Sequence, residues 1–292
     1  MRWKCLCSYD GTDFHGWQSQ SCASAIQDIL EARLRFIFDK HVRIHGSGRT
    51  DSGAHANGQV FHFDAHWQWG ESRLIAAINC GIPMEIRVFA AEHVADTFHA
   101  RFSAVRKRYE YRMLEGAASP FDYRYVHCLG RMRPDTDAMN AAAKIFLGRH
   151  DFSQFGANGG GSSGSAAKTM CEMQFIRDGR RITFVTEGSG YLYKMVRIMA
   201  GCLLQVGLGR IDAATLASAL AGHLDASAQL RRECLPANGL FLDRVYYNAQ
   251  DSMRPVEKEG AGDAADLSIT SAAANDEFYC KDAINEQSFR GK

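Results

Sequence analysis

Apolar side chains in residues 1–100 change repeatedly between a spacing of two and a spacing of three or four. The first spacing is typical of a half-buried strand and the second of an amphipathic helix. Ile26, Leu30 and Leu34, for example, would share one face of a helix. The pattern predicts, in chain order, a strand over 3–9, a helix over 25–38, strands over 42–44 and 60–63, a helix over 74–78 and a strand over 86–89. This order is that of a split βαβ unit, the ferredoxin-like arrangement.

Residues 101–248 repeat this order more loosely. They predict strands over 109–113 and 125–129, a helix over 135–147, strands over 171–177 and 181–187, helices over 191–206 and 212–222, and a strand over 240–247. We therefore expect an α+β fold built from two ferredoxin-like halves, residues 1–100 and 101–248. Glycine and serine dominate 156–165, which predicts a flexible loop. Residues 249–292 contain few large apolar side chains and are expected to form a disordered tail.

Charge is unevenly distributed along the chain. Residues 251–292 hold nine acidic and five basic side chains, a net charge of −4, so residues 1–250 carry +5 of the overall +1. A mildly basic body beside an acidic tail keeps nucleic acid among the possible partners. The N-terminus lacks the apolar run of a signal peptide, and no stretch approaches the roughly 20 apolar residues needed to span a bilayer. We expect a cytoplasmic protein without membrane association.

Several short motifs lack the surroundings that their chemistry requires. Residues 159–164 match both G-x-G-x-x-G and G-x-S-x-G, but they lie in the glycine-serine segment and not between a strand and a helix. Gly48 and Gly53 have the spacing of a P-loop, but no Lys-Ser or Lys-Thr pair follows them. His62 and His66 are spaced like two ligands on a helix, in a region that predicts a strand. A metal-dependent hydrolase therefore remains only a secondary alternative.

The glycine-rich stretch 46–58 is the strongest candidate for a functional loop. Its glycines allow the backbone to approach a ligand closely, and Asp51 lies at its centre beside Arg49 and Thr50. The local composition also fits a plain turn with a capping aspartate. In the functional interpretation Asp51 is a presented carboxylate, which a neighbouring guanidinium would keep ionised and ready to act as a nucleophile.

Two further features concern positive charge. The stretch 101–112 has a net charge of +4 and includes Arg101 and Arg108, interleaved with Tyr109 and Tyr111. Such a stretch is either a solvated strand face or a surface that grips an RNA backbone and stacks unpaired bases. Arg197 lies in an otherwise apolar helix, where an arginine usually needs a buried acidic partner. We expect Asp51 to be that partner.

Taken in order, these residues resemble the tRNA pseudouridine synthase A family, and the likeness runs from about Cys5 to Tyr247. The matching positions are Tyr9 to Gly11, Gly16 to Gln18 with Gln20, Gly48 to Asp51 with Gly53 and His55, Gly58 to Val60, Asn79 with Pro83, Phe98 to Phe102, Arg108 with Tyr109, Asp151 to Ser153, Met195 to Arg197 with Gly201, and Gly239 with Leu240. The ordered series is far more specific than the short block around Asp51 alone.

The resemblance implies isomerisation of uridine to pseudouridine in the anticodon arm of tRNA, at positions 38–40, without a metal ion or organic cofactor. It implies that Asp51 is the catalytic residue, attacking either the ribose or the uracil ring, and that Arg49 helps to displace the flipped base. It further implies that Tyr109 stacks on the uracil, that Arg197 pairs with the catalytic carboxylate and that Leu240 lines the pocket.

The resemblance also implies a homodimer that holds tRNA between its subunits, with the sheets of the two halves joined around a central RNA-binding cleft. Arg101 and Arg108 are predicted to bind the substrate. An RNA-binding protein that has lost catalysis on the same scaffold is the main alternative, but intact Arg49, Asp51, Tyr109 and Arg197 argue against it. Lys168 and Thr169 stand where the family often has a Ser-Pro-x-Arg-like segment, which leaves RNA contacts there open.

Overall fold

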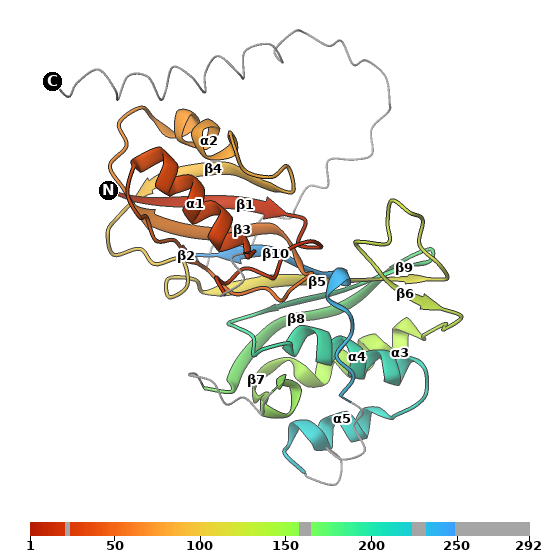
Figure 1. Ribbon diagram of the computed structural model, residues 1–292. Helices are drawn as coiled ribbons and strands as arrows, with labels where there is room; N and C mark the ends of the chain where they lie inside the picture. The colour runs from red at the N-terminus through yellow and green to blue at the C-terminus, as the bar shows by residue number, and fades with distance from the viewer. Residues whose placement is uncertain (21–23, 158–164, 224–231, 249–292) are drawn as a thin grey trace, which may run out of the picture.

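The computed structural model describes residues 1–20, 24–157, 165–223 and 232–248 (Figure 1). The predicted acidic tail lies outside the described residues, as does most of the predicted loop at 156–165. Within the described ranges, no helix is both long enough and apolar enough to cross a membrane.

The described residues form ten strands and five α-helices. The strands are β1 (Arg2–Tyr9), β2 (His45–Gly46), β3 (His55–Asp64), β4 (Ile86–Val94), β5 (Arg106–Glu115), β6 (His127–Gly130), β7 (Gly148–Asp151), β8 (Ala167–Asp178), β9 (Arg181–Gly188) and β10 (Leu240–Tyr246). The helices are α1 (Ile26–Phe38), α2 (Glu71–Asn79), α3 (Thr136–Ala143), α4 (Met195–Gly207) and α5 (Ala213–Leu220). The predicted α+β class is confirmed.

All ten strands belong to one sheet, whose main order is β4-β1-β3-β10-β5-β9-β8-β7, with β2 paired to β3 and β6 to β5. The first half contributes the order β4-β1-β3-β2, and the second half repeats it as β10-β5-β9-β8. Neighbouring strands within each set of four are antiparallel. The two sets join through a short parallel pairing of β10 with β3. The second half therefore repeats the strand order of the first within one continuous sheet.

Helices lie against both halves of the sheet. Figure 1 shows α1 and α2 beside β1, β3 and β4, and α3, α4 and α5 grouped beside β8 in the other half. Helix α4 is buried on nearly every side, as its apolar sequence predicts. Among the described residues, the hydrophobic core of the protein contains three free thiols, those of Cys5 and Cys7 on β1 and of Cys202 on α4.

The expected strand over 42–44 is wrong, because β2 covers only His45–Gly46. Val42 and Ile44 are buried as their alternation predicts, but the backbone of Ile44 bonds to side chains of α1 instead of a neighbouring strand. Its N–H donates to Glu31 Oε1 at 3.0 Å, and its carbonyl accepts from Gln27 Nε2 at 3.3 Å. Two polar side chains of α1 therefore bond to the backbone groups of Ile44 that a neighbouring strand would otherwise have paired.

Three histidines gather where β2, β3 and the connection between the halves meet. The ring centroids of His62 and His99 are 4.7 Å apart, and those of His62 and His45 are 5.0 Å apart. Nδ1 of His62 accepts a hydrogen bond from the backbone N–H of Ala100 at 3.1 Å, which requires an unprotonated nitrogen there. Burial, helped by the positive charge that His99 can carry, lowers the pKa of His62 to about 4.

We expect this histidine to make the fold less stable at mildly acidic pH. The unfolded chain takes up a proton near pH 6.5, whereas folded His62 resists it down to about pH 4, so stability falls as pH decreases across that window. The loss for this group is at most about 3 kcal/mol. Urea denaturation of the parent and of His62→Asn, whose Oδ1 takes nearly the position of the histidine Nδ1 and can still accept from Ala100, should show a flatter pH profile for the variant. Parallel profiles between pH 6.5 and 4.5 would contradict this expectation.

Candidate active site

Asp51 lies in the loop between β2 and β3, and two glycines from the β1–α1 connection allow another stretch of backbone to press against that loop. A Cβ atom at Gly11 would lie 1.8 Å from the carbonyl oxygen of Ala54. Gly16 has a φ of +77°, and a Cβ atom there would lie 2.5 Å from the carbonyl oxygen of Thr50. The backbone N–H of Trp17 donates to that same carbonyl at 3.2 Å. The close contact fixes the backbone on either side of Asp51.

Asp51 forms an ion pair with Arg197 of α4, as the sequence predicts. Nη1 of Arg197 lies 2.6 Å from Oδ2 of Asp51, and the two side chains are only 12% and 15% exposed. Nε of Arg197 donates to the carbonyl oxygen of Leu235 at 2.6 Å, which holds the guanidinium in place. An ion pair this short, between two side chains that are largely shielded from solvent, fixes the position of the Asp51 carboxylate.

The Arg197→Met variant should lower the free energy of unfolding by about 3 kcal/mol, because it leaves the Asp51 carboxylate largely buried without a partner. Adding Asp51→Asn to this variant should recover part of the loss, since the neutral amide has less need of a cation. Urea denaturation of both single variants and the double variant gives the coupling energy. Strictly additive losses would show that the ion pair does not contribute to stability.

Tyr109 of β5 lies close to this ion pair. It is 7% exposed, and its ring meets that of Tyr191 edge to face with centroids 4.9 Å apart. Burial, with a contribution from the negative charge of Asp51, raises the pKa of Tyr109 above its usual value, so its hydroxyl is neutral at neutral pH. The hydroxyl of Tyr191 bonds to Thr186, whereas that of Tyr109 has no hydrogen-bond partner within the described part of the chain. It is therefore free to bond to a substrate.

Side chains of β1 and β3 hold the Asp51 loop in place through hydrogen bonds. The hydroxyl of Tyr9 lies 2.9 Å from that of Thr50, and Nε2 of Gln59 donates to the carbonyl oxygen of Gly48 at 3.0 Å. Oε1 of the same Gln59 accepts from the hydroxyl of Ser47 at 2.6 Å. Tyr9 and Gln59 match the family motifs, but nothing in the sequence showed that they hold the Asp51 loop.

Of the other predicted site residues, Leu240 is buried, whereas Arg49 and Arg101 are exposed. Leu240 is buried at the start of β10, opposite Tyr111 of β5. Arg49 is exposed beside Asp51, and its Nε donates to Oε1 of Gln18 at 3.0 Å. Arg101 is exposed, with its guanidinium 5.6 Å from the centre of the Phe102 ring.

Arg108, the last of the predicted site residues, lies on the face of the sheet away from Asp51. Side chains alternate along a strand, so Arg108 points to the face of β5 opposite Tyr109. There it pairs with Glu172 and lies 3.6 Å from Asp243 and 3.9 Å from Glu187. The positive charge of Arg108 is neutralised on a face turned away from Asp51, so the substrate contact predicted for it has no support in this geometry.

This arrangement supports nucleophilic or acid-base chemistry by side chains. It combines a carboxylate, a guanidinium that holds it and a neutral phenol within one site. Among the described residues, no group of three histidine, cysteine or acidic side chains is placed to hold a metal ion.

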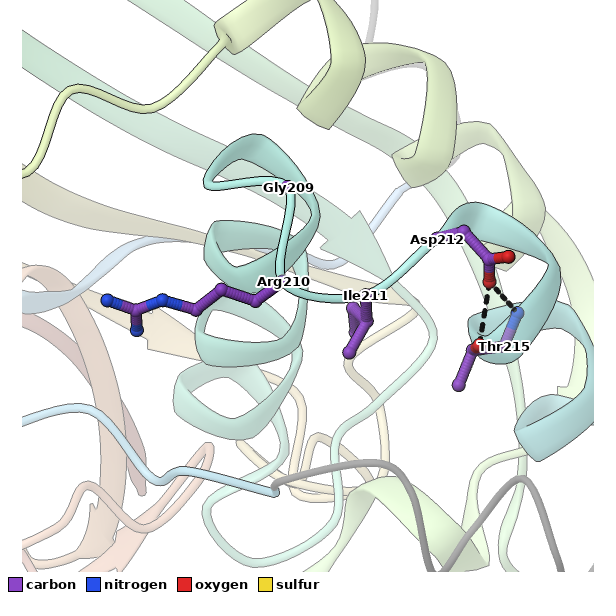
Figure 2. Close-up of a pocket in the computed structure, with 5 residues that line it drawn as sticks. All are labelled: Gly209, Arg210, Ile211, Asp212 and Thr215. Carbon is purple, nitrogen blue, oxygen red and sulfur yellow. Dashed lines mark hydrogen bonds between the residues drawn. The ribbon is translucent and has the colours of Figure 1, made fainter.

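A separate hollow lies at the far end of α4. Figure 2 shows its lining, in which Asp212 accepts hydrogen bonds from the backbone N–H and the hydroxyl of Thr215. These are the bonds of a helix cap, since Asp212 precedes the first residue of α5. Arg197 lies in the first turn of α4, at the opposite end of the helix from this hollow, which is therefore not part of the site.

A family model described as tRNA pseudouridine synthase matches residues 6–103 and 142–248. The chain belongs to this family. Among its relatives, the tRNA pseudouridine synthase A of Bradyrhizobium diazoefficiens is 40% identical over 248 residues, covering 84% of this chain and 99% of the relative. The protein of the same name from Lysinibacillus sphaericus is 37% identical over 248 residues, again covering 84% of this chain and 99% of the relative.

Proposed function

We propose that this protein isomerises uridine to pseudouridine in tRNA, at positions 38–40 of the anticodon arm, with Asp51 as the catalytic carboxylate. The observation that carries the proposal is the Asp51–Arg197 ion pair beside Tyr109, in a chain that belongs to the tRNA pseudouridine synthase family. An RNA-binding protein without catalysis would have no need of a carboxylate held by a guanidinium close to a buried phenol.

The chemistry needs no co-reactant. The N1–C1′ glycosidic bond breaks and a C5–C1′ bond forms, while C5 loses one proton and N1 gains one, so the product has the same composition as the substrate. Asp51 attacks either C1′ of the ribose or C6 of the uracil, and either route requires an ionised carboxylate. Side chains alone can carry out these steps, which agrees with the proposed absence of a metal ion or organic cofactor.

The target base must first leave its stack, which costs a few kcal/mol. Arg49 is exposed beside Asp51, and we propose that it takes the place of the displaced base. The ring of Tyr109 then stacks on the uracil, and Leu240 lines the pocket on the β10 side. Arg101 is the remaining proposed substrate contact, on the exposed connection between the halves.

We further propose that the halves are ferredoxin-like units, because the order β4-β1-β3-β2 recurs as β10-β5-β9-β8. In the same proposal the cleft for RNA lies between the halves, and the protein acts as a cytoplasmic homodimer. Analytical ultracentrifugation of the full chain tests the dimer, since a mass near 32.4 kDa at all concentrations would contradict it.

The decisive test of the activity is release of tritium from tRNA that contains uridine labelled at C5. The purified protein should release the label from transcripts with uridine at positions 38–40, and transcripts with cytidine at these positions should release none. Chemical mapping of pseudouridine in the same transcripts identifies the modified positions. Tight tRNA binding without tritium release would favour the inactive RNA-binding alternative.

A further inference from the structure

The face of the sheet that carries Tyr109 also carries cations that lack acidic partners. Side chains alternate along β5, so Lys107 and Tyr109 share the face toward Asp51. Arg106 and Arg108 on the opposite face pair with carboxylates, but no ion pair involves Lys107, Lys168 or Arg101 within the described ranges. The active-site face therefore keeps positive charge that the fold leaves unneutralised.

Lys107 lies directly under the Asp51 loop. Its Nζ donates to the carbonyl oxygen of Ser47 at 2.6 Å, and a Cβ atom at Gly48 would lie 3.1 Å from the same Nζ. Burial, helped by the positive charges of Arg101 and Lys168, lowers the pKa of Lys107 to about 8. An ammonium group that is desolvated and has no counter-ion is ready to bind an anion.

Lys168 approaches the same region from β8. Lys107 pairs with Gly188 of β9, and Gly188 pairs in turn with Met170 of β8. Lys168 is two residues from Met170 on the same face, so the Cα atoms of the two lysines lie roughly 12 Å apart. The stem of Lys168 lies against Gly190, with Cδ 3.7 Å from the position of a Cβ atom there. Gly190 directly precedes Tyr191, whose ring contacts Tyr109. The stem of Lys168 therefore lies near the tyrosine pair, and its ammonium group donates to the carbonyl oxygen of Ser165 at 2.6 Å in an exposed position.

We propose that Lys107 and Lys168 bind backbone phosphates of the nucleotides next to the reacting uridine, and that Lys107 links this binding to the position of the Asp51 loop. The inference rests on the proposed function. Ammonium groups bind phosphate as compact point charges, and two of them on the same face of the sheet can contact nearby phosphates of one strand. Because Lys107 also holds Ser47, a phosphate at this ammonium fixes the loop once RNA is bound.

The test is the salt dependence of tRNA binding by the full chain. Removing one lysine that binds a phosphate should reduce the slope of log Kd against log salt concentration by about 0.7–0.9. Lys107→Met and Lys168→Met should each lower this slope by that amount, and the double variant by about 1.4–1.8, with affinity at low salt reduced about tenfold for each lysine removed. Lys40→Met changes an exposed lysine beyond the far end of α1 and should keep the parent slope.

Lys107→Arg is the charge-preserving control. It keeps the positive charge at this position, so it should keep the parent slope. A parent slope in the Lys107→Met and Lys168→Met double variant would overturn the proposal. A fall in turnover with an unchanged slope in Lys107→Met would also overturn it, since Lys107 would then only support the loop. Binding is measured without turnover, so this result is independent of tritium release by the parent, which tests the proposed activity.

Discussion

The Asp51→Asn variant is expected to lose turnover by at least about 10⁴-fold while it keeps its fold and its affinity for tRNA. The amide has nearly the shape of the carboxylate and can still accept a hydrogen bond from Arg197, so the local structure should persist. It cannot attack carbon as an anion or hold the charge that a carboxylate holds. Whether the reaction passes through C1′ or C6, this step is lost.

Single-turnover release of tritium and equilibrium binding of the same tRNA measure the two quantities separately. Asp13→Asn is a matched control, because Asp13 lies in the neighbouring β1–α1 connection and pairs with Arg124 at 2.8 Å on the surface. It should turn over at the parent rate. Turnover of Asp51→Asn within tenfold of the parent would remove Asp51 from the catalytic role.

The Asp51–Arg197 pair shows what can be predicted from the sequence. The two residues are 146 positions apart, yet an arginine in an apolar helix needs a buried acid, and a glycine-rich loop with a central aspartate offers one. The strand and helix order of both halves is likewise predictable, because it depends on local apolar spacing.

The roles within the run 106–108 could not be predicted, because they depend on contacts between distant strands. Arg106, Lys107 and Arg108 are all basic, so residue type alone does not distinguish their roles. The alternation of β5 predicts only that Lys107 faces the other way from its neighbours. Pairing with β8, β9 and β10 brings Glu172, Glu187 and Asp243 to the face of Arg108. The same pairing leaves Lys107 under the Asp51 loop, with no acidic partner among the residues that the structure describes.

The position of β2 could not be predicted for a similar reason. Alternation correctly predicts that Val42 and Ile44 are buried. Whether the backbone there joins a sheet depends on which groups take its hydrogen bonds, and Gln27 and Glu31 of α1 take them at Ile44. A pattern of apolar residues contains no information about that competition.

Tyr109→Phe is expected to lower turnover by about 10²-fold with little change in tRNA affinity. The ring is kept, so stacking on the uracil survives, but the hydroxyl that could take part in removing the C5 proton is gone. The raised pKa of Tyr109 means that the phenol is neutral at working pH, so in the proposed reaction it would act as a relay that accepts one proton while it gives up its own. In the proposed reaction Asp51 attacks carbon, so another group must move this proton.

Tyr109→Leu separates the ring from the hydroxyl. It should match the loss of turnover in Tyr109→Phe and lose in addition roughly 1–3 kcal/mol of base contact, seen as weaker binding. Tyr246→Phe is a matched control, because Tyr246 is a buried tyrosine of the neighbouring β10 with its pKa raised to about 12 by burial. Its ring lies by Arg106, on the face of the sheet away from Asp51, so its variant should keep the parent rate. If Tyr109→Phe also turns over at the parent rate, the hydroxyl has no part in proton transfer, and Tyr109 contributes only the surface on which the uracil stacks.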